Sequence, residues 1–293
     1  MNSLAHQLFD TLPSHIRVPL LHLRATGKIP NIFRPRNLND LHAWRKLNIK
    51  RGSSLGDLLV VTGSKLLMRD WVSERGLSQH LPDLIEVLRS PAELAEFRWT
   101  APCVLKAAHG SAMNAFLQEE PSPKRLEEVK RGAVRWFDRG HGHSAGEWWY
   151  GLGPRAILVE GFFGERGESP PDYKFFCIRG EPQFVQVDHN RHTGHRRNLF
   201  LPDWTPLNST LSVRPGKGAA RPEKLSEMLD IAKRLSEPFD LVRIDLYHLA
   251  SGRILIGEIT HSPGSGWEYL SDNEFSQAIV KTYYRLNPGW PSI

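Results

Sequence analysis

The sequence VRIDL at residues 242–246, followed by GEIT at residues 257–260, carries the most information in this chain of 293 residues. Both runs alternate apolar and polar residues, and this alternation predicts two β-strands that each have one buried face. In a strand every second side chain lies on the same face, so Arg243 and Asp245 share a face, and a short hairpin would bring Glu258 beside them. The sequence therefore predicts one cation and two carboxylates at neighbouring positions of a sheet.

These three charged residues suit a magnesium site that faces a phosphoryl group. Mg²⁺ takes oxygen ligands, commonly one or two carboxylates together with nucleotide phosphates and water, so Asp245 and Glu258 are candidate metal ligands. Arg243 would then face the transferred phosphoryl group. The same pattern is explained equally well by an exposed cross-strand cluster of Arg, Asp and Glu that binds no ligand. Such clusters are common on sheets and contribute little to stability.

Lysines in apolar surroundings shift this balance towards a phosphate site. Lys106 ends the run VL at 104–105, and Lys174 stands inside DYKFF at 172–176. Such a lysine must extend its amine to solvent or find an anion, and for each lysine alone the first explanation suffices. Together with Lys65 they offer several cations to a triphosphate, each worth roughly 4 kcal/mol at 4 Å for an effective dielectric of 20.

Hydrophobic periodicity predicts mixed helix and strand structure along the rest of the chain. Prolines interrupt residues 1 to about 50, which predicts only short helices and turns there. The expected strands are residues 58–61, 103–106, 156–160, 173–178, 183–188, 241–248 and 253–260, with 173–188 and 241–260 forming hairpins. The expected helices are residues 65–74, 123–138 and 222–236.

Taken in order, these motifs resemble the ATP-grasp superfamily, and most closely its TupA-like branch, which is linked to teichuronopeptide and other bacterial surface-polymer biosynthesis. The resemblance extends from about residue 58 to residue 266. Each motif is short, and their order along the chain makes the resemblance specific. The motifs are SK at 64–65 with Arg69, KAAHG at 106–110, WWY at 148–150, LVE at 158–160, DYKFF at 172–176, RID at 243–245, GEIT at 257–260 and PGSG at 263–266.

The resemblance implies an α+β protein with the ATP-grasp fold, in which two α+β lobes clasp ATP after a short, mostly helical N-terminal segment. The expected domains are residues 1–57 for that segment and residues 58–293 for the catalytic domain, with a mobile lobe at about 100–157. The implied cofactors are ATP and Mg²⁺.

The resemblance also implies a role for individual residues. The nucleotide-binding set is Lys65, Lys106, His109, Gly110, Ser111, Val159, Glu160, Phe162, Asp172 and Lys174. Its three lysines would contact phosphates, residues 109–111 would lie in a loop that covers the phosphates, and Glu160 with the backbone just after it would hold adenine at the hinge. The catalytic set is Arg243 and Lys174, and the metal set is Asp245 and Glu258. The residues themselves, rather than the resemblance, suggest a substrate set. Arg191 could bind an acidic substrate, and His261, Ser262 and Ser265 could donate hydrogen bonds at a turn formed by residues 264–266, although a simple tight turn explains that stretch almost as well.

Three positions depart from the family pattern. Ser64 stands where many relatives have an acid, and Ala112 stands where the phosphate-covering loop usually has a second glycine. The alanine predicts a loop that closes less freely. Thr260 occupies the place of a metal-binding Asn, although the TupA-like branch often has Thr there, so the choice between one and two Mg²⁺ ions stays open.

The implied reaction is ADP-forming ligation of a carboxylate to an amine through an acyl phosphate, in surface polysaccharide or peptide-like metabolite biosynthesis. The partners would be small-molecule acids and amines, or a polysaccharide precursor. A kinase acting on a sugar or alcohol would keep the same ATP residues, and a non-catalytic nucleotide-binding assembly protein is a third hypothesis. Retention of Arg243, Asp245 and Glu258 favours an enzyme, because a protein that only binds nucleotide need not align a phosphoryl group.

Composition sets wider bounds. The formal net charge of +6 suits an anionic partner, but the basic residues are scattered and no nucleic-acid-binding motif accompanies them, so no nucleic-acid partner is expected. No apolar run near the N-terminus is long enough for a membrane span or signal peptide, which predicts a cytoplasmic protein. The two cysteines, Cys103 and Cys177, lie in strand-like runs, each followed by an aliphatic residue, and are expected to be free buried thiols.

Two further patterns allow competing interpretations. Histidines recur every third residue at 189, 192 and 195, a spacing that could suggest zinc, but the neighbouring arginines would repel a cation and could instead bind an acidic substrate. The aromatic run at 148–150 could stack a sugar or base, although aromatic clusters before a strand more often belong to the core.

Overall fold

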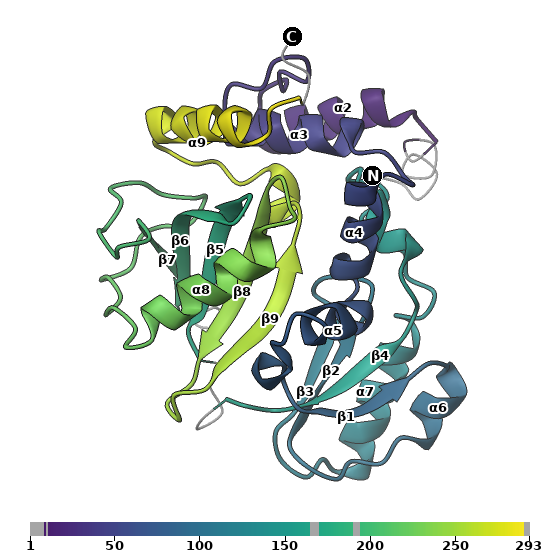
Figure 1. Ribbon diagram of the computed structural model, residues 1–293. Coiled ribbons are helices and arrows are strands. Elements are labelled where there is room, and N and C mark those ends of the chain that lie inside the picture. Colours follow the sequence, from purple (N-terminus) through teal and green to yellow (C-terminus); the bar gives the residue numbers. More distant parts are fainter. Residues whose placement is uncertain (1–8, 10, 165–169, 190–193, 290–293) are drawn as a thin grey trace. The chain divides into compact units, whose positions relative to one another are not determined.

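The computed structural model describes residue 9 and residues 11–164, 170–189 and 194–289 (Figure 1). Contacts divide the chain into two compact units: unit 1 comprises residues 1–56, 144–147 and 171–293, and unit 2 comprises residues 57–143 and 148–170. Each unit combines helices with one antiparallel sheet, so the predicted α+β class is confirmed. The predicted catalytic domain at 58–293 and its mobile lobe stay predictions.

Unit 1 contains a five-stranded antiparallel sheet in the order β7-β6-β5-β8-β9. Its strands are β5 (Asp172–Ile178), β6 (Glu181–His189), β7 (Arg196–Phe200), β8 (Val242–His248) and β9 (Ile254–Thr260). Both predicted hairpins are present, β5 with β6 and β8 with β9. The first turns at Arg179 and Gly180, which have φ of 47° and 79°, and this left-handed pair matches the twist that a tight hairpin requires. Strand β7 was not predicted.

Helices cover the two faces of this sheet differently. Helix α8 (Leu225–Ser236) contacts β5, β6 and β8, and Figure 1 shows it lying across these strands. Helices α3 (Leu38–Asn48) and α9 (Asn273–Leu286) contribute apolar side chains to a core with Phe176 and Phe184, which belong to the opposite face. Strand alternation places Lys174 on the face that carries Phe176. On this face the apolar residues pack against helices α3 and α9. The polar residues, such as Lys174, are not part of that apolar core and could bind a ligand.

A buried ion pair ties the N-terminal helices to the sheet. Arg45 of α3 donates from Nε and Nη2 to the two carboxylate oxygens of Asp240, each at 2.8 Å, and Tyr283 of α9 donates to the same carboxylate at 2.9 Å. Arg45 and Asp240 are 1% and 0% exposed. Helix α2 (Ser14–Thr26) packs against α3. The N-terminal segment is thus built into unit 1.

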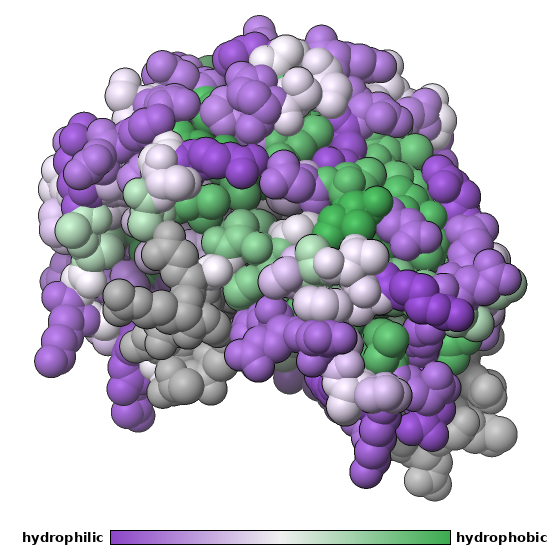
Figure 2. Space-filling view, turned by 90° about the horizontal axis from the view of Figure 1, so that it is seen from below, coloured by the Kyte–Doolittle hydropathy of each residue, from purple (hydrophilic) through white to green (hydrophobic). Residues whose placement is uncertain are grey.

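Unit 2 contains a four-stranded sheet in the order β1-β4-β2-β3. Its strands are β1 (Leu84–Leu88), β2 (Cys103–Ala107), β3 (Asn114–Leu117) and β4 (Ile157–Gly161). The helices of this part of the chain are α4 (Ser54–Gly63), α5 (Lys65–Ser73), α6 (Pro91–Glu96) and α7 (Pro123–Val134), with a 3-10 turn at Trp148–Leu152. Trp149 and Tyr150 are buried, as the core interpretation of the aromatic run expected. Figure 2 shows one face of the molecule, on which both hydrophilic and hydrophobic residues are exposed.

One predicted strand is wrong. Residues 58–61 lie in helix α4, not in a strand. A run of four apolar residues fits a buried helix as well as a strand, and length normally decides between them. Here burial recurs at Gly56, Leu59 and Thr62 with the spacing of a helix. The helix predicted at 123–138 is confirmed, but it ends at Val134.

Candidate active site

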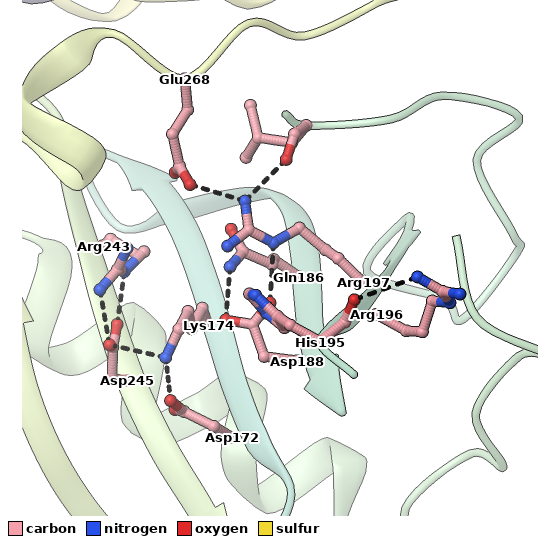
Figure 3. Close-up of polar contacts among 11 residues, drawn as sticks. Asp172, Lys174, Gln186, Asp188, His195, Arg196, Arg197, Arg243, Asp245 and Glu268 are labelled. Carbon is pink, nitrogen blue, oxygen red and sulfur yellow. Dashed lines mark hydrogen bonds and ion pairs between the residues drawn. The ribbon is translucent and has the colours of Figure 1, made fainter. Parts of the chain in front are cut away.

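The predicted charged residues of β8 meet Lys174 of β5. Lys174 lies directly opposite Asp245, which in turn lies opposite Glu258 of β9. The Lys174 amine donates to Asp245 Oδ2 at 3.1 Å and also pairs with Asp172 (Figure 3). Arg243 donates from Nε and Nη2 to the two oxygens of Asp245 at 2.6 and 2.7 Å. The structure therefore brings the predicted catalytic and metal residues of this sheet together, with Asp172 beside them.

The charged side chains around Asp245 are buried, so each shifts the pKa of its neighbours strongly. Lys174, Asp172 and Asp245 are 2%, 3% and 4% exposed. Burial raises the pKa of Asp245, but the charges of Arg243 and Lys174 and their hydrogen bonds outweigh it, so the pKa of Asp245 lies below its usual range. Burial lowers the pKa of Arg243, and the carboxylate of Asp245 more than reverses this, so that pKa is raised. Both groups are therefore ionised at neutral pH.

The carboxylates of this cluster fit Mg²⁺. Asp245 and Glu258 are cross-strand neighbours, whose Cβ atoms are typically about 5 Å apart, and they supply hard oxygen donors. Within the described parts of the chain, no group of three His, Cys, Asp or Glu side chains could hold a metal ion by itself. Mg²⁺ commonly uses one or two carboxylates and fills its other positions with phosphates and water, so two carboxylates suffice. Thr260 accepts from Arg243 Nη2 at 3.2 Å.

A second charged cluster forms in unit 2 around Glu160. Strand β4 pairs with β2, which places Glu160 near Lys106. Lys106 Nζ lies 2.7 Å from Glu160 Oε2, and Arg69 Nη1 of α5 lies 3.0 Å from Glu160 Oε1. Neither cation merely extends to solvent, because both engage a carboxylate that is 8% exposed. Arg69 was quoted in the sequence motif but was missing from the predicted site, since nothing local to it signals its partner.

The predicted phosphate-covering loop is held by Lys65. Its amine donates to the carbonyl of Gly110 at 2.7 Å, and its backbone N–H donates to Ala108 at 2.8 Å. A Cβ at Gly110 would lie 2.1 Å from Met113 Cε, so a larger residue there would displace the end of the methionine side chain. Ala112 has φ of 57°, a left-handed conformation that glycine adopts without cost and alanine does not. The usual glycine of this position is thus replaced by a strained alanine.

The remaining predicted nucleotide residues lie around this loop and β4. Val159 is fully buried, and the backbone N–H of Phe162 donates to Pro102 at 2.9 Å. A ring nitrogen of His109 lies 2.9 Å from the carbonyl of Trp136. Burial is the largest cause that lowers the pKa of His109. Ser111 is exposed.

The predicted substrate residues lie in and before the 3-10 turn η3 (Pro263–Gly266). His261 and Ser262 are buried, and Ser265 has φ of 53°. Helix α3 fixes this turn by binding its carbonyls. Lys46 donates to Ser265 O at 2.8 Å, and Asn39 donates to Gly266 O at 2.8 Å and to Glu268 O at 2.9 Å. The sequence predicted short helices in this region but not the contact between α3 and the turn, because no motif links residues that are more than two hundred positions apart. The fourth candidate, Arg191, lies outside the described residues.

A buried sheet face that brings cations and carboxylates together fits the site that the resemblance to ATP-grasp proteins implies, and a family comparison agrees with that resemblance. The family model described as TupA-like ATPgrasp matches residues 144–282. Residues 144–282 are therefore similar to the TupA-like ATP-grasp family, and this match confirms the resemblance of the motifs that they contain. This segment contains Glu160 and all the charged residues of the β5–β8–β9 cluster.

Solved structures with similar folds are distant in sequence. The chain is similar to the D-alanine–D-alanine ligase of Helicobacter pylori, with 16% identity, a TM-score of 0.48, and coverage of 87% of this chain and 68% of that one. It is also similar to the ADP complex of purK, N5-carboxyaminoimidazole ribonucleotide synthetase, with 15% identity, a TM-score of 0.44, and coverage of 69% and 45%. The chain is also similar to the L-amino acid ligase of Bacillus licheniformis, with 15% identity, a TM-score of 0.42, and coverage of 76% of this chain and 46% of that one.

The chain spans about half the length of the last two of these proteins. No curated protein matches it. Within the described residues, the structure has no helix whose length and apolar character would allow it to cross a membrane.

Proposed function

We propose that this protein is an ADP-forming carboxylate–amine ligase that uses Mg·ATP and an acyl phosphate intermediate. The observation that carries the proposal is the buried cluster in which Lys174 and Arg243 contact Asp245, with Glu258 opposite. Aligned cations and carboxylates on a rigid sheet suit phosphoryl transfer, where catalysis consists mainly of positioning and charge stabilisation. The D-alanine–D-alanine ligase and the L-amino acid ligase named above are both ligases.

Residues of both units have roles in this reaction. Lys65, Lys106 and Lys174 bind phosphates, with residues 109–111 covering them, and Glu160 and the following backbone bind adenine. Asp245 and Glu258 hold Mg²⁺, which neutralises charge on the phosphates when it is bound. In the structure Lys174 pairs with Asp172 and Asp245, and Lys106 pairs with Glu160. These are the cations that bound phosphates would contact.

The chemistry then follows in two steps. A substrate carboxylate attacks the γ-phosphorus of ATP, and ADP leaves as an acyl phosphate forms. The amine next attacks the carbonyl carbon, the bond from that carbon to the phosphate oxygen breaks, and phosphate leaves. Arg243 and Lys174 stabilise the charge on the phosphoryl group, and the low exposure of the cluster excludes water that would hydrolyse the intermediate. The turn at 263–266, with His261, Ser262 and Ser265, positions the acid.

We further propose that the enzyme acts in the cytoplasm on precursors of a bacterial surface polysaccharide or a peptide-like metabolite, as the family resemblance implies. ADP release should therefore be measured against amino acids, sugar acids and amines, alone and in pairs. We expect ADP release that requires an acid and an amine together, with one free phosphate per ADP. Release that a sugar or alcohol supports alone would favour a kinase.

Lys106→Met is expected to weaken ATP binding by about tenfold or more, because a charge-assisted hydrogen bond to phosphate is lost while most of the apolar stem remains. Glu160 keeps its second partner, Arg69, so the fold should persist. Calorimetry with Mg·ATP measures the effect. Lys130→Met is a matched control in the same unit, since the Lys130 amine only binds the carbonyl of Ala95. Equal ATP affinity in Lys106→Met and the wild type would exclude a phosphate contact.

A further inference from the structure

Another polar cluster, separate from the phosphoryl-transfer residues and from the Glu160 cluster, lies on strands β6 and β7 and includes Glu268 from the segment after η3. Asp188 Oδ1 accepts from Arg197 Nε at 2.7 Å and from a ring nitrogen of His195 at 3.0 Å, and Asp188 Oδ2 accepts from Gln186 Nε2 at 2.9 Å. Arg197 Nη1 donates to Glu268 Oε1 at 2.7 Å. Figure 3 shows Arg197 paired with Asp188 and Glu268, and Gln186 beside Asp188. We call Gln186, Asp188, Arg197 and Glu268 the β6–β7 cluster.

This cluster lies on the same sheet face as the phosphoryl-transfer residues. Gln186 is directly opposite Lys174, and Asp188 is directly opposite both Asp172 and Arg197. Residues opposite one another in antiparallel strands project to the same face, with Cβ atoms about 5 Å apart. Figure 3 shows both groups side by side on neighbouring strands. A ligand at Gln186 would therefore lie one strand away from Lys174.

Glu268 connects the cluster to the turn that is proposed to bind the acid. It follows η3 by two residues, and its side chain crosses the turn at Gly264. A Cβ on Gly264 would lie 2.4 Å from Glu268 Cγ, and Gly264 has φ of 53°. Only glycine fits this position without displacing Glu268. The acid turn and the β6–β7 cluster are thus neighbours in space.

The cluster has unused hydrogen-bond acceptors and an excess of negative charge. Gln186 is fully buried, yet its Oε1 has no hydrogen-bond partner among the described residues. Glu268 uses only Oε1 in its ion pair, and its side chain is 23% exposed. Two carboxylates, Asp188 and Glu268, surround one guanidinium. A buried acceptor without a donor is costly, so the cluster is suited to a ligand that brings N–H donors and positive charge.

We propose that the β6–β7 cluster binds the amino group of the nucleophile, as an ammonium ion, with Gln186 Oε1 and Glu268 as its acceptors. The inference rests on the proposed ligase function, for which it names the second substrate's binding site. An anion is disfavoured here, because both Asp188 and Glu268 would repel it. The site places the amine beside the strand of Lys174 and next to the acid turn. To become a nucleophile the ammonium loses one proton, which the Glu268 carboxylate accepts, and the neutral amine then attacks the acyl carbon.

Calorimetry with two small probes tests this assignment. Ethanolamine serves as the cation and glycolate as the anion of similar size, each titrated into the full chain with and without Mg·ADP. We expect ethanolamine to bind at millimolar concentration and glycolate to bind more weakly at this site. Glu268→Gln should weaken ethanolamine binding by about tenfold, because it removes the charge and keeps the shape. Glu181→Gln, at an exposed carboxylate on the same strand β6, is the control and should bind ethanolamine as the wild type does.

Gln186→Met provides a second variant that retains side-chain volume, should Glu268→Gln fail to fold. It should weaken ethanolamine binding by removing the acceptor. The proposal is overturned if wild-type protein does not bind ethanolamine, if the folded variants bind it as tightly as wild type, or if glycolate is preferred and Glu268→Gln strengthens its binding. The same titrations record Mg·ADP affinity. Absence of nucleotide binding would contradict the ligase function separately from the amine site.

Discussion

Glu258→Gln is expected to lower ligase turnover by at least about a hundredfold, because it removes one of two carboxylates proposed to hold Mg²⁺ beside the transferred phosphoryl group. The fold should be unaffected, since glutamine has the same shape and Glu258 is only partly buried. Steady-state ADP release as a function of Mg²⁺ concentration measures the effect. Far-UV circular dichroism checks the fold.

Glu181→Gln again serves as the control, because its carboxylate contacts only Arg285 in an exposed pair on the same sheet. It should have wild-type turnover and Mg²⁺ dependence. If Glu258→Gln also has wild-type turnover with unchanged Mg²⁺ dependence, Glu258 is not a metal ligand and the metal assignment is wrong.

Arg45→Met is expected to lower the free energy of unfolding of unit 1 by about 3–5 kcal/mol, since it leaves the buried carboxylate of Asp240 without its guanidinium partner. Such a loss is a large fraction of the roughly 5–15 kcal/mol of a typical domain. Arg45 also donates to the carbonyls of His261 and Leu241, so three acceptors lose a donor together. Urea unfolding measures the change.

Two further variants distinguish the stability lost by leaving a buried charge unpaired from the stability lost through poorer packing. Replacing both partners, Arg45→Met with Asp240→Leu, should recover part of the stability, because no unpaired charge remains. Arg285→Met breaks an exposed ion pair and should cost less than about 1 kcal/mol. Equal, small losses for Arg45→Met and Arg285→Met would show that the buried pair does not hold α3 to the sheet.

The same ion pair predicts how stability depends on pH. Burial raises the pKa of Asp240, but Arg45 outweighs it, so the pKa of the folded state lies below the ordinary value. Its contribution is present above the unfolded-state pKa of about 4 and is lost as the pH falls towards the lower folded-state value.

The sheet that carries the site could be predicted from sequence because its signals are local. Alternation in VRIDL and GEIT and the short connection between them determine that Asp245 and Glu258 are neighbours, and the structure has this register. Lys174 could be suspected, because a lysine in an apolar run must either extend its amine to solvent or find an anion. Its partners could not be named without the pairing of β5 with β8.

Other parts of the site depend on contacts that sequence patterns do not encode. Arg45 and Asp240 are 195 residues apart, and neither lies in a motif. Strand β7 was not predicted, because it begins with two consecutive arginines and lacks the regular apolar alternation of a half-buried strand, yet Arg197 is buried against Asp188. The helix at 54–63 was mistaken for a strand, since four apolar residues cannot reveal which periodicity their neighbours continue.

The proposed acyl phosphate distinguishes a ligase from a kinase and can be trapped directly. Hydroxylamine is a small nucleophile that intercepts an acyl phosphate and yields a hydroxamate. With Mg·ATP and the acid that best supports ADP release, we predict that hydroxamate and free phosphate form in equal amounts with ADP. A stable phosphate ester, with no free phosphate and no hydroxamate, would show that the enzyme is a kinase and contradict the ligase assignment.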